Sequence, residues 1–121
     1  MTALKLRILF DGAMLGPGKA QLLEHIRETG SIAAAGRQMD MSYRRAWLLV
    51  EEMNTAFVQP LVSSARGGPG GGGARLTETG EEVLRLYREV VARSEQAAAP
   101  AVAALEGMLR AKQASEILSG K

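Results

Sequence analysis

Two breaks in a long helical stretch constrain the fold of this chain more than any other feature of its sequence. Apolar residues recur at helical spacing over residues 19 to 29, and Gly30 follows at a position where a left-handed residue often ends a helix. Ser31 offers an N-cap hydroxyl to the short, alanine-rich segment of residues 32 to 39, and Ser42 offers a second one soon after it. The breaks predict three helices joined by short connections.

The third of these helices, from Tyr43 to about Phe57, has two chemically different faces. One face is apolar and consists of Ala46, Leu49, Val50, Met53 and Phe57. The opposite face projects Arg44, Arg45, Leu48 and Glu52. Spacing of this kind is typical of a helix that buries one side and exposes the other. We therefore expect arginine side chains on the outer surface near the start of the helix.

Extended segments are predicted on both sides of the helices. Residues 4 to 10 alternate apolar with mostly basic side chains, which is the period-two pattern of a strand with one buried face. Beyond Pro60, residues 61 to 65 and 74 to 77 are two short extended stretches on either side of a glycine-rich run. The pattern predicts one N-terminal strand and, later in the chain, a hairpin with a long tip.

A long amphipathic helix is predicted after the hairpin. Either Thr77 or Thr79 can cap it, the latter with Glu82 as a capping box. A domain of this size is expected to cover only part of the helix's wide apolar stripe, so we expect residues 79 to 99 to dimerise. Pro100 is expected to begin or kink a last helix. The stripe that defines the expected dimer contacts consists of Val83, Leu84, Leu86, Tyr87, Val90 and Val91.

Composition excludes several classes of function. The 121 residues include no cysteine and one histidine, so disulfide scaffolds, thiol chemistry and zinc-thiolate sites are excluded. His25 lies in a pattern typical of the surface flank of a helix, and a single histidine builds neither a nucleophile-base pair nor a metal cluster. We expect no enzymatic activity, no cofactor and no metal. No stretch approaches about 20 apolar residues without a charge, so a cytoplasmic protein is expected.

Positive charge is concentrated in the middle of the chain. Residues 31 to 76 contain five arginines and three acidic residues, which gives a net charge of +2. Residues 1 to 30 sum to +1 and residues 77 to 121 to −1. The whole chain also has a net charge of +2, which by itself is too small to indicate an acidic partner. The distribution nevertheless points to the region of the third helix and the hairpin.

A helix, a short helix, a tight turn, a longer helix and a hairpin within about 60 residues is the order of elements in a winged helix-turn-helix DNA-binding domain. In such domains the N-terminal half of the third helix enters the major groove. Here that half contains Ser42, Tyr43, Arg44 and Arg45. Two arginines in a first turn are unfavourable next to the helix dipole unless an anion is present, and DNA supplies one. The alternative is that both arginines only increase solubility.

The glycine-rich run is predicted to be the tip of the wing. A phosphate-binding loop of the Walker type would end in Gly-Lys-Ser or Gly-Lys-Thr, whereas Gly73 is followed by Ala74 and Arg75. A flexible linker is the other alternative, but short extended segments on both sides favour a hairpin. Arg66 and Arg75 flank the run and are expected to bind backbone phosphates. Ser31 and Arg37, around the preceding short helix, complete the candidate DNA-binding set.

Two segments resemble a known protein family. Residues 30 to 54, GSIAAAGRQMDMSYRRAWLLVEEMN, together with the later GGPGGGGARLTETG, resemble the N-terminal DNA-binding domain of ModE-type molybdate-responsive transcriptional regulators. The resemblance extends from Leu4 to about Leu109. It implies a dimeric bacterial transcription factor in which Ser42, Tyr43, Arg44 and Arg45 face the major groove, with the wing beside them. It also implies dimer contacts from the long helix.

The sequence departs from this family pattern in two ways. Family members commonly have alanine at the position of Gly36 and glycine at the position of Asp40, although Asp tolerates a left-handed conformation well enough to keep the turn. The molybdate-sensing members continue into a pair of small oxyanion-binding domains, for which this chain has no residues after Lys121. Molybdate binding is therefore not expected from this chain.

The predicted fold class is mainly α with a small β component: a winged helix-turn-helix with a long C-terminal dimerisation helix. Residues 1 to 76 form the DNA-binding part, with the wing at about 61 to 76, and residues 77 to 121 supply dimerisation helices and a tail within the same unit. The expected function is a stand-alone, sequence-specific transcriptional regulator whose partners are double-stranded DNA and a second copy of the chain. The alternative is an interaction module that pairs with another regulator and binds DNA weakly.

Overall fold

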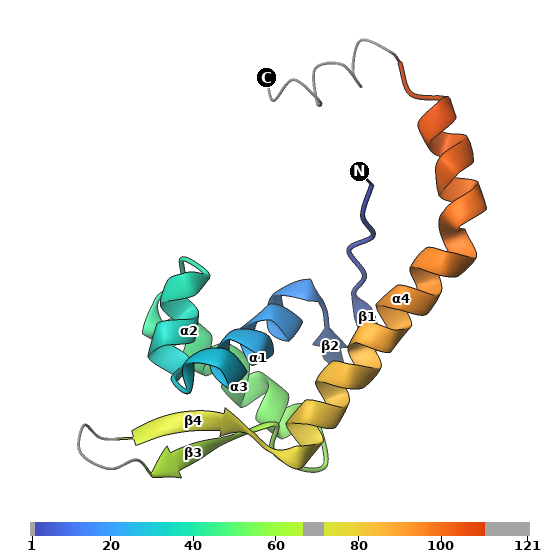
Figure 1. Cartoon of the computed structure of the whole chain (residues 1–121). Helices are drawn as coiled ribbons and strands as arrows, with labels where there is room; N and C mark the ends of the chain where they lie inside the picture. The colour runs from blue at the N-terminus through green and yellow to red at the C-terminus, as the bar shows by residue number, and fades with distance from the viewer. Residues whose placement is uncertain (1, 67–71, 111–121) are drawn as a thin grey trace.

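The structure, a computed structural model, describes residues 2–66 and 72–110. Three helices form the body, a hairpin extends from one side of it, and one long helix leads away from it (Figure 1). Together these elements make a mainly α-helical winged helix-turn-helix, as the sequence predicts. In chain order the elements are β1 (Ile8–Phe10), β2 (Ala13–Leu15), α1 (Pro17–Thr29), α2 (Ile32–Gln38), α3 (Tyr43–Ala56), β3 (Val62–Arg66), β4 (Gly72–Leu76) and α4 (Glu78–Gly107).

The three helices begin and end where local capping residues allow. Gly30 ends α1 in the left-handed region at φ 72°, which confirms its predicted role. The Ser31 hydroxyl accepts a hydrogen bond from the Ala34 amide at 3.0 Å, and the Ser42 hydroxyl accepts one from the Arg45 amide at 3.1 Å. Asp40 takes a φ of 56° in the turn between α2 and α3, which confirms that aspartate keeps this turn.

The N-terminal strand is shorter than predicted and belongs to a small hairpin. β1 pairs antiparallel with β2, with Ile8 opposite Leu15, and Gly12 occupies the turn at φ 87°. The expectation of one strand over residues 4 to 10 was wrong in its extent, and β2 was not predicted. The alternation itself is present, since Leu4 and Leu6 are half-buried and Lys5 between them is exposed, but this stretch has no strand beside it. It runs next to α4 instead (Figure 1).

The core lies where α1, α3, the base of the wing and the start of α4 meet. α1 contributes Leu22, Leu23 and Ile26, all without exposed surface. The apolar face predicted for α3 is confirmed at its centre, where Ala46, Val50 and Met53 are buried. Burial of each large aliphatic side chain contributes about 1.5 to 3 kcal/mol. The other parts of the core come from Leu15, Ala20, Ala35, Leu61, Val62, Ala74, Leu76, Leu84 and Tyr87.

The wing is an antiparallel pair of five-residue strands. β3 and β4 are in register from Val62 opposite Leu76 to Arg66 opposite Gly72. The predicted hairpin is therefore confirmed, and two glycines assigned to its tip, Gly72 and Gly73, are part of β4. The rest of the predicted tip, residues 67–71, lies outside the described residues.

α4 is one continuous helix of 30 residues, about 45 Å long. Thr77 is its N-cap, so the alternative capping box of Thr79 with Glu82 is not used. Pro100 lies inside the helix and does not begin a new one, and the helix changes direction along its outer part (Figure 1). Within residues 2–66 and 72–110, no helix is long and apolar enough to cross a membrane.

Candidate nucleic-acid interface

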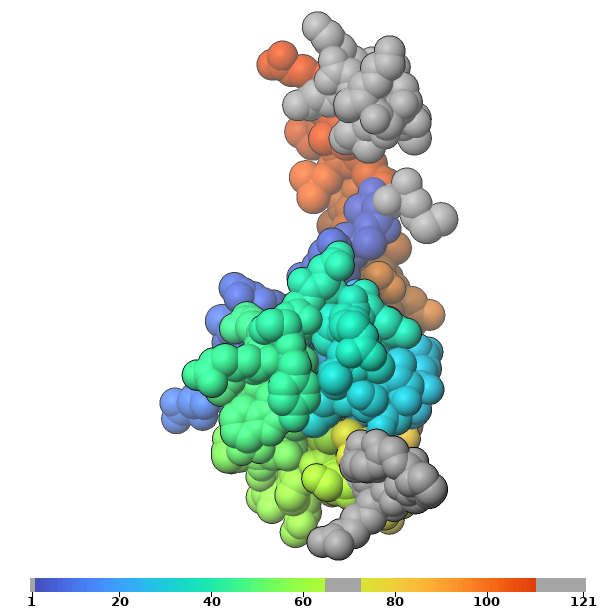
Figure 2. Space-filling model, turned by 90° about the vertical axis from the view of Figure 1, so that its left-hand side faces the viewer, coloured from blue at the N-terminus to red at the C-terminus, as the bar shows by residue number. Residues whose placement is uncertain are grey.

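The N-terminal half of α3 lies on the surface with its arginines facing outward. Arg44 and Arg45 are exposed, while Ala46 on the opposite face is buried. This confirms the predicted orientation of the helix. Ser42 is exposed as the N-cap, and Tyr43 has 57% of its surface accessible. In Figure 2, α2 and α3 cover the face turned to the viewer, with the wing below them.

The arginines on this face have no acidic partners in the described part of the chain. Arg37 at the end of α2, Arg44 and Arg45 on α3, and Arg75 on β4 are exposed, and none of them forms an ion pair with another described residue. No acidic residue occupies the first turn of α3 to offset the two arginines there. Positive side chains next to the positive end of a helix dipole are unfavourable by a few tenths of a kcal/mol in the absence of an anion.

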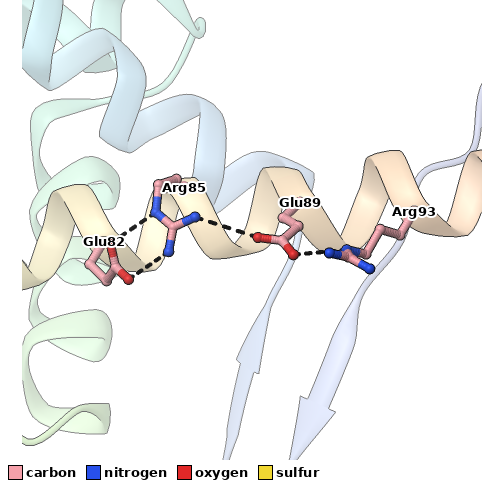
Figure 3. A network of polar contacts seen from close by, with 4 residues as sticks. All are labelled: Glu82, Arg85, Glu89 and Arg93. Carbon is pink, nitrogen blue, oxygen red and sulfur yellow. Dashed lines mark hydrogen bonds and ion pairs between the residues drawn. The ribbon is translucent and has the colours of Figure 1, made fainter.

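The arginines of α1 and α4 are all paired with glutamates. Arg88 of α4 binds Glu24 of α1 through two hydrogen bonds, and Arg27 of α1 binds Glu81 at 3.0 Å. Along α4 a chain of contacts runs from Glu82 through Arg85 and Glu89 to Arg93 (Figure 3). The hydrogen bonds from Arg85 lower the pKa of Glu82, and the same carboxylate raises the pKa of Arg85. The pairs of Arg88 with Glu24 and of Arg27 with Glu81 hold α4 against α1, and every arginine of these two helices already has an acidic partner.

The base of the wing is fixed from two sides by side-chain hydrogen bonds. Asn54 on α3 accepts from the amides of Leu61 and Val62 at 2.8 and 3.1 Å and donates to the carbonyl of Val62 at 3.1 Å. From the other side, the Thr77 hydroxyl donates to the carbonyl of Pro60 at 2.6 Å. The wing therefore has a defined direction relative to α3.

Gly80 allows the first turn of α4 to approach the wing base. A Cβ at this position would overlap the carbonyl oxygen of Leu61, a backbone atom that cannot move aside. The Thr77 amide donates to the same carbonyl at 2.9 Å. Close packing of α4 and the residues just before β3 thus requires a glycine here.

The structure brings some of the predicted DNA-binding residues together and separates others. Ser31 and Tyr43 line one hollow together with Trp47 and Ser64, between the helices and the wing. Arg45 lines a different hollow on the far side of α3, towards β2. The side chain of Arg66 lies outside the described residues, and its backbone ends β3 opposite Gly72.

Sequence analysis missed three residues of this region. Trp47 lies one helical turn after Tyr43 and is 42% exposed, and its i, i+4 spacing from Tyr43 could have indicated a shared face. Asn54 is the polar residue next to Met53 on the inner side of α3, and a polar group at such a place signals a specific partner. Ser64 alternates with the half-buried Ser63 on β3, but nothing in the sequence distinguishes the two.

The stripe on α4 proposed for dimer contacts is divided by the structure. Leu84 and Tyr87 are 3% and 2% exposed inside their own chain, so they pack in the core and are not available to a partner in this conformation. Leu86 and Val90 are 46% and 40% exposed. Val83 and Val91 are half-buried. The accessible part of the stripe borders an apolar groove of about 430 Å³, which Phe10 and Phe57 line from the other side.

His25, the single histidine, lies on the inner flank of α1 close to Glu28. It is half-buried on α1, and its Nδ1 lies 3.9 Å from a Glu28 carboxylate oxygen without a hydrogen bond. The described residues contain no cluster of three potential metal ligands.

Comparison with known proteins connects this region to transcriptional regulators. No protein-family model matches the chain. Over 81 residues, or 67% of its length, the chain is 43% identical to the molybdenum-pterin-binding protein MopB of Rhodobacter capsulatus, 30% of which is covered. It is 42% identical over 71 residues, or 59% of its length, to the DNA-binding transcriptional dual regulator ModE of Escherichia coli, of which 27% is covered. The molybdenum transport protein ModE of Azotobacter vinelandii is 38% identical over 77 residues, which are 64% of this chain and 28% of that protein.

The predicted resemblance is therefore confirmed, with the qualification that the chain spans less than a third of the length of these relatives. The matched segment is large enough to include most of the helices and the wing described above. Through that segment, the chain is a homologue of the ModE-type transcriptional regulators.

Proposed function

We propose that this chain binds duplex DNA in a sequence-specific manner and regulates transcription. The observation that supports this most is the group of four exposed arginines without acidic partners, Arg37, Arg44, Arg45 and Arg75, around the exposed start of α3 and the wing. An anionic ligand would relieve the unfavourable charge at the start of α3. The names of the relatives agree with a DNA-binding regulator and do not favour the alternative of a pairing module that binds DNA weakly.

The arrangement suggests a division of roles. We propose that Arg44 and Arg45, in the first turn of α3, contact base edges in the major groove, where arginine recognises guanine through O6 and N7. Ser42, Ser31 and Arg37 lie around the adjoining helix ends and are suited to phosphate contacts. Arg75 would bind phosphates beside the wing, and the sequence leads us to expect the same role for Arg66.

Binding selection and salt dependence test this function directly. The chain is used to select duplexes from a random pool. Its affinity for the selected duplex and for a scrambled one is then measured at salt concentrations from about 50 to about 200 mM, the range over which binding to phosphates weakens measurably. We expect enrichment of a common sequence and an affinity that falls steeply with salt, because several phosphate counterions are released. Failure to enrich any sequence, with affinity independent of salt, would remove the proposal.

A dimer is the second part of the proposal. Leu86 and Val90 leave apolar surface exposed next to the groove lined by Phe10 and Phe57, and a second copy of the chain would bury it. Two copies of α3 about one DNA turn apart would double the length of sequence contacted. Val90→Asp is expected to shift the chain towards the monomer, measured by sedimentation at micromolar concentration. An unchanged mass for this variant would exclude the groove from the interface.

We further infer a role in molybdenum-dependent regulation, because the names of several relatives refer to molybdenum. Bacterial regulators of this type act in the cytoplasm, and we propose the same compartment here. Calorimetric titration of the chain with molybdate tests whether the oxyanion binds this segment itself. We expect no binding, and we therefore expect the affinity for DNA to be the same with and without molybdate.

A further inference from the structure

A hollow lies between α3 and the wing that the proposed contacts to base edges do not use. It has a volume of about 320 Å³ and is lined on the α3 side by Tyr43 and Trp47, on the wing side by Ser64, Gly73 and Ala74, and on the α2 side by Ser31, Ile32 and Ala33. Ser31, the N-cap of α2, closes its third side. No charged side chain lines the hollow. Tyr43, the first residue of α3, lines the hollow and is exposed, so the hollow adjoins the exposed start of this helix.

Three side chains that line the hollow carry hydrogen-bond donors that no other described residue uses. The Tyr43 hydroxyl, the Trp47 indole N–H and the Ser64 hydroxyl make no hydrogen bond to any other residue that the structure describes. The indole nitrogen can only donate, so its ligand must offer an acceptor. Tyr43 and Trp47 are about half-exposed, at 57% and 42%, so two aromatic surfaces are also open to the ligand. A suitable ligand therefore combines acceptor oxygens with apolar surface.

The position of the hollow indicates which ligand this is. In the complex proposed above, α3 occupies the major groove with the wing beside it, so the sugar-phosphate strand at the edge of that groove would run along the surface between α3 and the wing. Phosphate oxygens accept hydrogen bonds, and deoxyribose offers apolar surface to an aromatic ring. Arg75 on β4 adjoins Ala74 of the hollow and is exposed, which adds positive charge beside the strand.

We propose that this hollow binds the sugar-phosphate strand at the edge of the major groove, with the Trp47 ring against deoxyribose and its indole N–H donating to a phosphate oxygen. Tyr43 and Ser64 donate to the same strand, so that Tyr43 contacts the backbone and the adjacent arginines contact bases. Trp47 thereby contributes affinity without sequence preference. The proposal rests on the DNA binding proposed above and assigns a separate part of the surface to it.

The primary test compares Trp47→Phe with the wild-type chain on the selected and the scrambled duplex. Phenylalanine keeps an aromatic ring and removes the donor. We expect about tenfold weaker binding to both duplexes, since a hydrogen bond to a charged group is lost, with the salt slope unchanged because no charge is removed. A loss confined to the selected duplex would mean that Trp47 contacts bases, and no loss would mean that the hollow is empty in the complex; either result overturns the proposal.

Two serines provide a matched control. Ser64 lines the hollow and Ser63, its neighbour on β3, does not. Ser64→Ala is expected to weaken binding to both duplexes severalfold, whereas Ser63→Ala should leave it unchanged. Equal losses in the two variants would indicate a general effect on the wing and count against the hollow. Thermal unfolding of each variant separates loss of fold from loss of contact.

Chemically modified DNA identifies the contacted phosphate. Single phosphates of the selected duplex are replaced one at a time by neutral methylphosphonate, and the affinities of the wild-type chain and of Trp47→Phe are compared. At one linkage the wild-type chain should lose affinity and the variant should lose much less, because the partner is already absent. Additive losses at every linkage would overturn the phosphate assignment. If the wild-type chain binds no duplex at all, the proposed function itself fails, which is distinct from either result.

The chain's single tryptophan gives a direct readout as well. Trp47 is the only tryptophan in the sequence, so all indole fluorescence comes from this hollow. Binding of either duplex is expected to protect it from acrylamide quenching to the same extent. Full accessibility of Trp47 in the saturated complex would contradict the proposal.

Discussion

The two sides of this molecule use arginine in opposite ways. On the side formed by α1 and α4, the arginines are bound to glutamates, both between the helices and along α4. On the side formed by α2, α3 and the wing, Arg37, Arg44, Arg45 and Arg75 have no such partners among the described residues. A net charge of +2 for the whole chain conceals this separation. The number of basic residues is therefore less informative than whether each one is already paired.

The two tyrosines follow the same division. Tyr87 on α4 is 2% exposed, and its hydroxyl donates to the carbonyl of Leu6 at 2.6 Å. Tyr43 on α3 is 57% exposed and makes no hydrogen bond within the described segments. The buried hydroxyl of Tyr87 stabilises the fold, whereas the exposed hydroxyl of Tyr43 is available to a ligand. This difference predicts which variants affect stability and which affect binding.

The largest expected effect comes from breaking the connection between the two sides. Gly80→Ala places a methyl group against the Leu61 backbone, where nothing flexible can move aside. We expect a loss of about 3 kcal/mol or more in the free energy of unfolding, because overpacking against backbone is costly. Gly107→Ala, at the far end of the same helix with open space around it, should instead be neutral or gain about 0.5 to 1 kcal/mol. Chemical denaturation measures both, and equal effects would refute the contact.

Removing an unpaired and a paired arginine tests the comparison itself. Arg44→Ala and Arg45→Ala are each expected to weaken specific duplex binding by about 1 to 3 kcal/mol and to leave stability unchanged. Arg85→Ala removes the same charge from α4 and should change stability little, because its ion pairs are exposed to solvent, and leave DNA affinity unchanged. Fluorescence anisotropy and thermal unfolding distinguish the two outcomes. Equal losses of affinity would mean that only net charge matters.

The wing arginines are expected to show a smaller, sequence-independent effect. Arg75→Ala, and likewise Arg66→Ala, should lower affinity for all duplexes alike and reduce the slope of log affinity against log salt by about one. Arg93→Ala removes an equal charge from a residue bound to Glu89 and should leave the slope unchanged. A change in sequence preference in the wing variants would instead place these side chains at base edges.

The smallest expected effect concerns the two tyrosines. Burial raises the pKa of Tyr87 above its ordinary value of 10.0. Burial favours the protonated, neutral form of this hydroxyl. Its contribution to the free energy of unfolding is therefore fully present below the ordinary pKa of tyrosine and is lost as the pH rises through the raised pKa of the folded chain. Tyr87→Phe should lose about 1 kcal/mol of stability at neutral pH. Above pH ~10 its free energy of unfolding should decline less with pH than that of the wild-type chain. Tyr43→Phe should change neither quantity. The measurement is urea unfolding at several pH values, and identical alkaline profiles for Tyr87→Phe and the wild-type chain would contradict the role of Tyr87.

Local features of the sequence predicted this fold well, whereas features that depend on distant contacts were missed. Gly30, Ser31 and Ser42 ended and began helices as expected because capping involves residues within one turn. The β2 strand was missed because three residues are too few to show periodicity. The burial of Leu84 and Tyr87 depends on which part of α4 faces the N-terminal segment, and helical spacing alone does not specify that.

For the candidate site, the sequence predicted that the arginines of α3 face outward, but not that they lack acidic partners among the described residues. Pairs three or four residues apart, such as Arg85 with Glu82 and Glu89, follow from helical spacing. The pairs between α1 and α4 do not, since 64 residues separate Arg88 from Glu24. Whether an arginine is free therefore becomes visible only when the helices are packed together.

The hydrogen bonds at the base of the wing have a consequence for how this hairpin can vary. Asn54 and Thr77 hold residues 60 to 62 from both sides, so the direction of β3 and β4 is set where the strands begin. Residues inserted between Arg66 and Gly72 would leave these hydrogen bonds in place, because the bonds lie at the opposite end of β3 and β4. The direction of the hairpin is therefore expected to stay constant when the number of residues between the two strands changes.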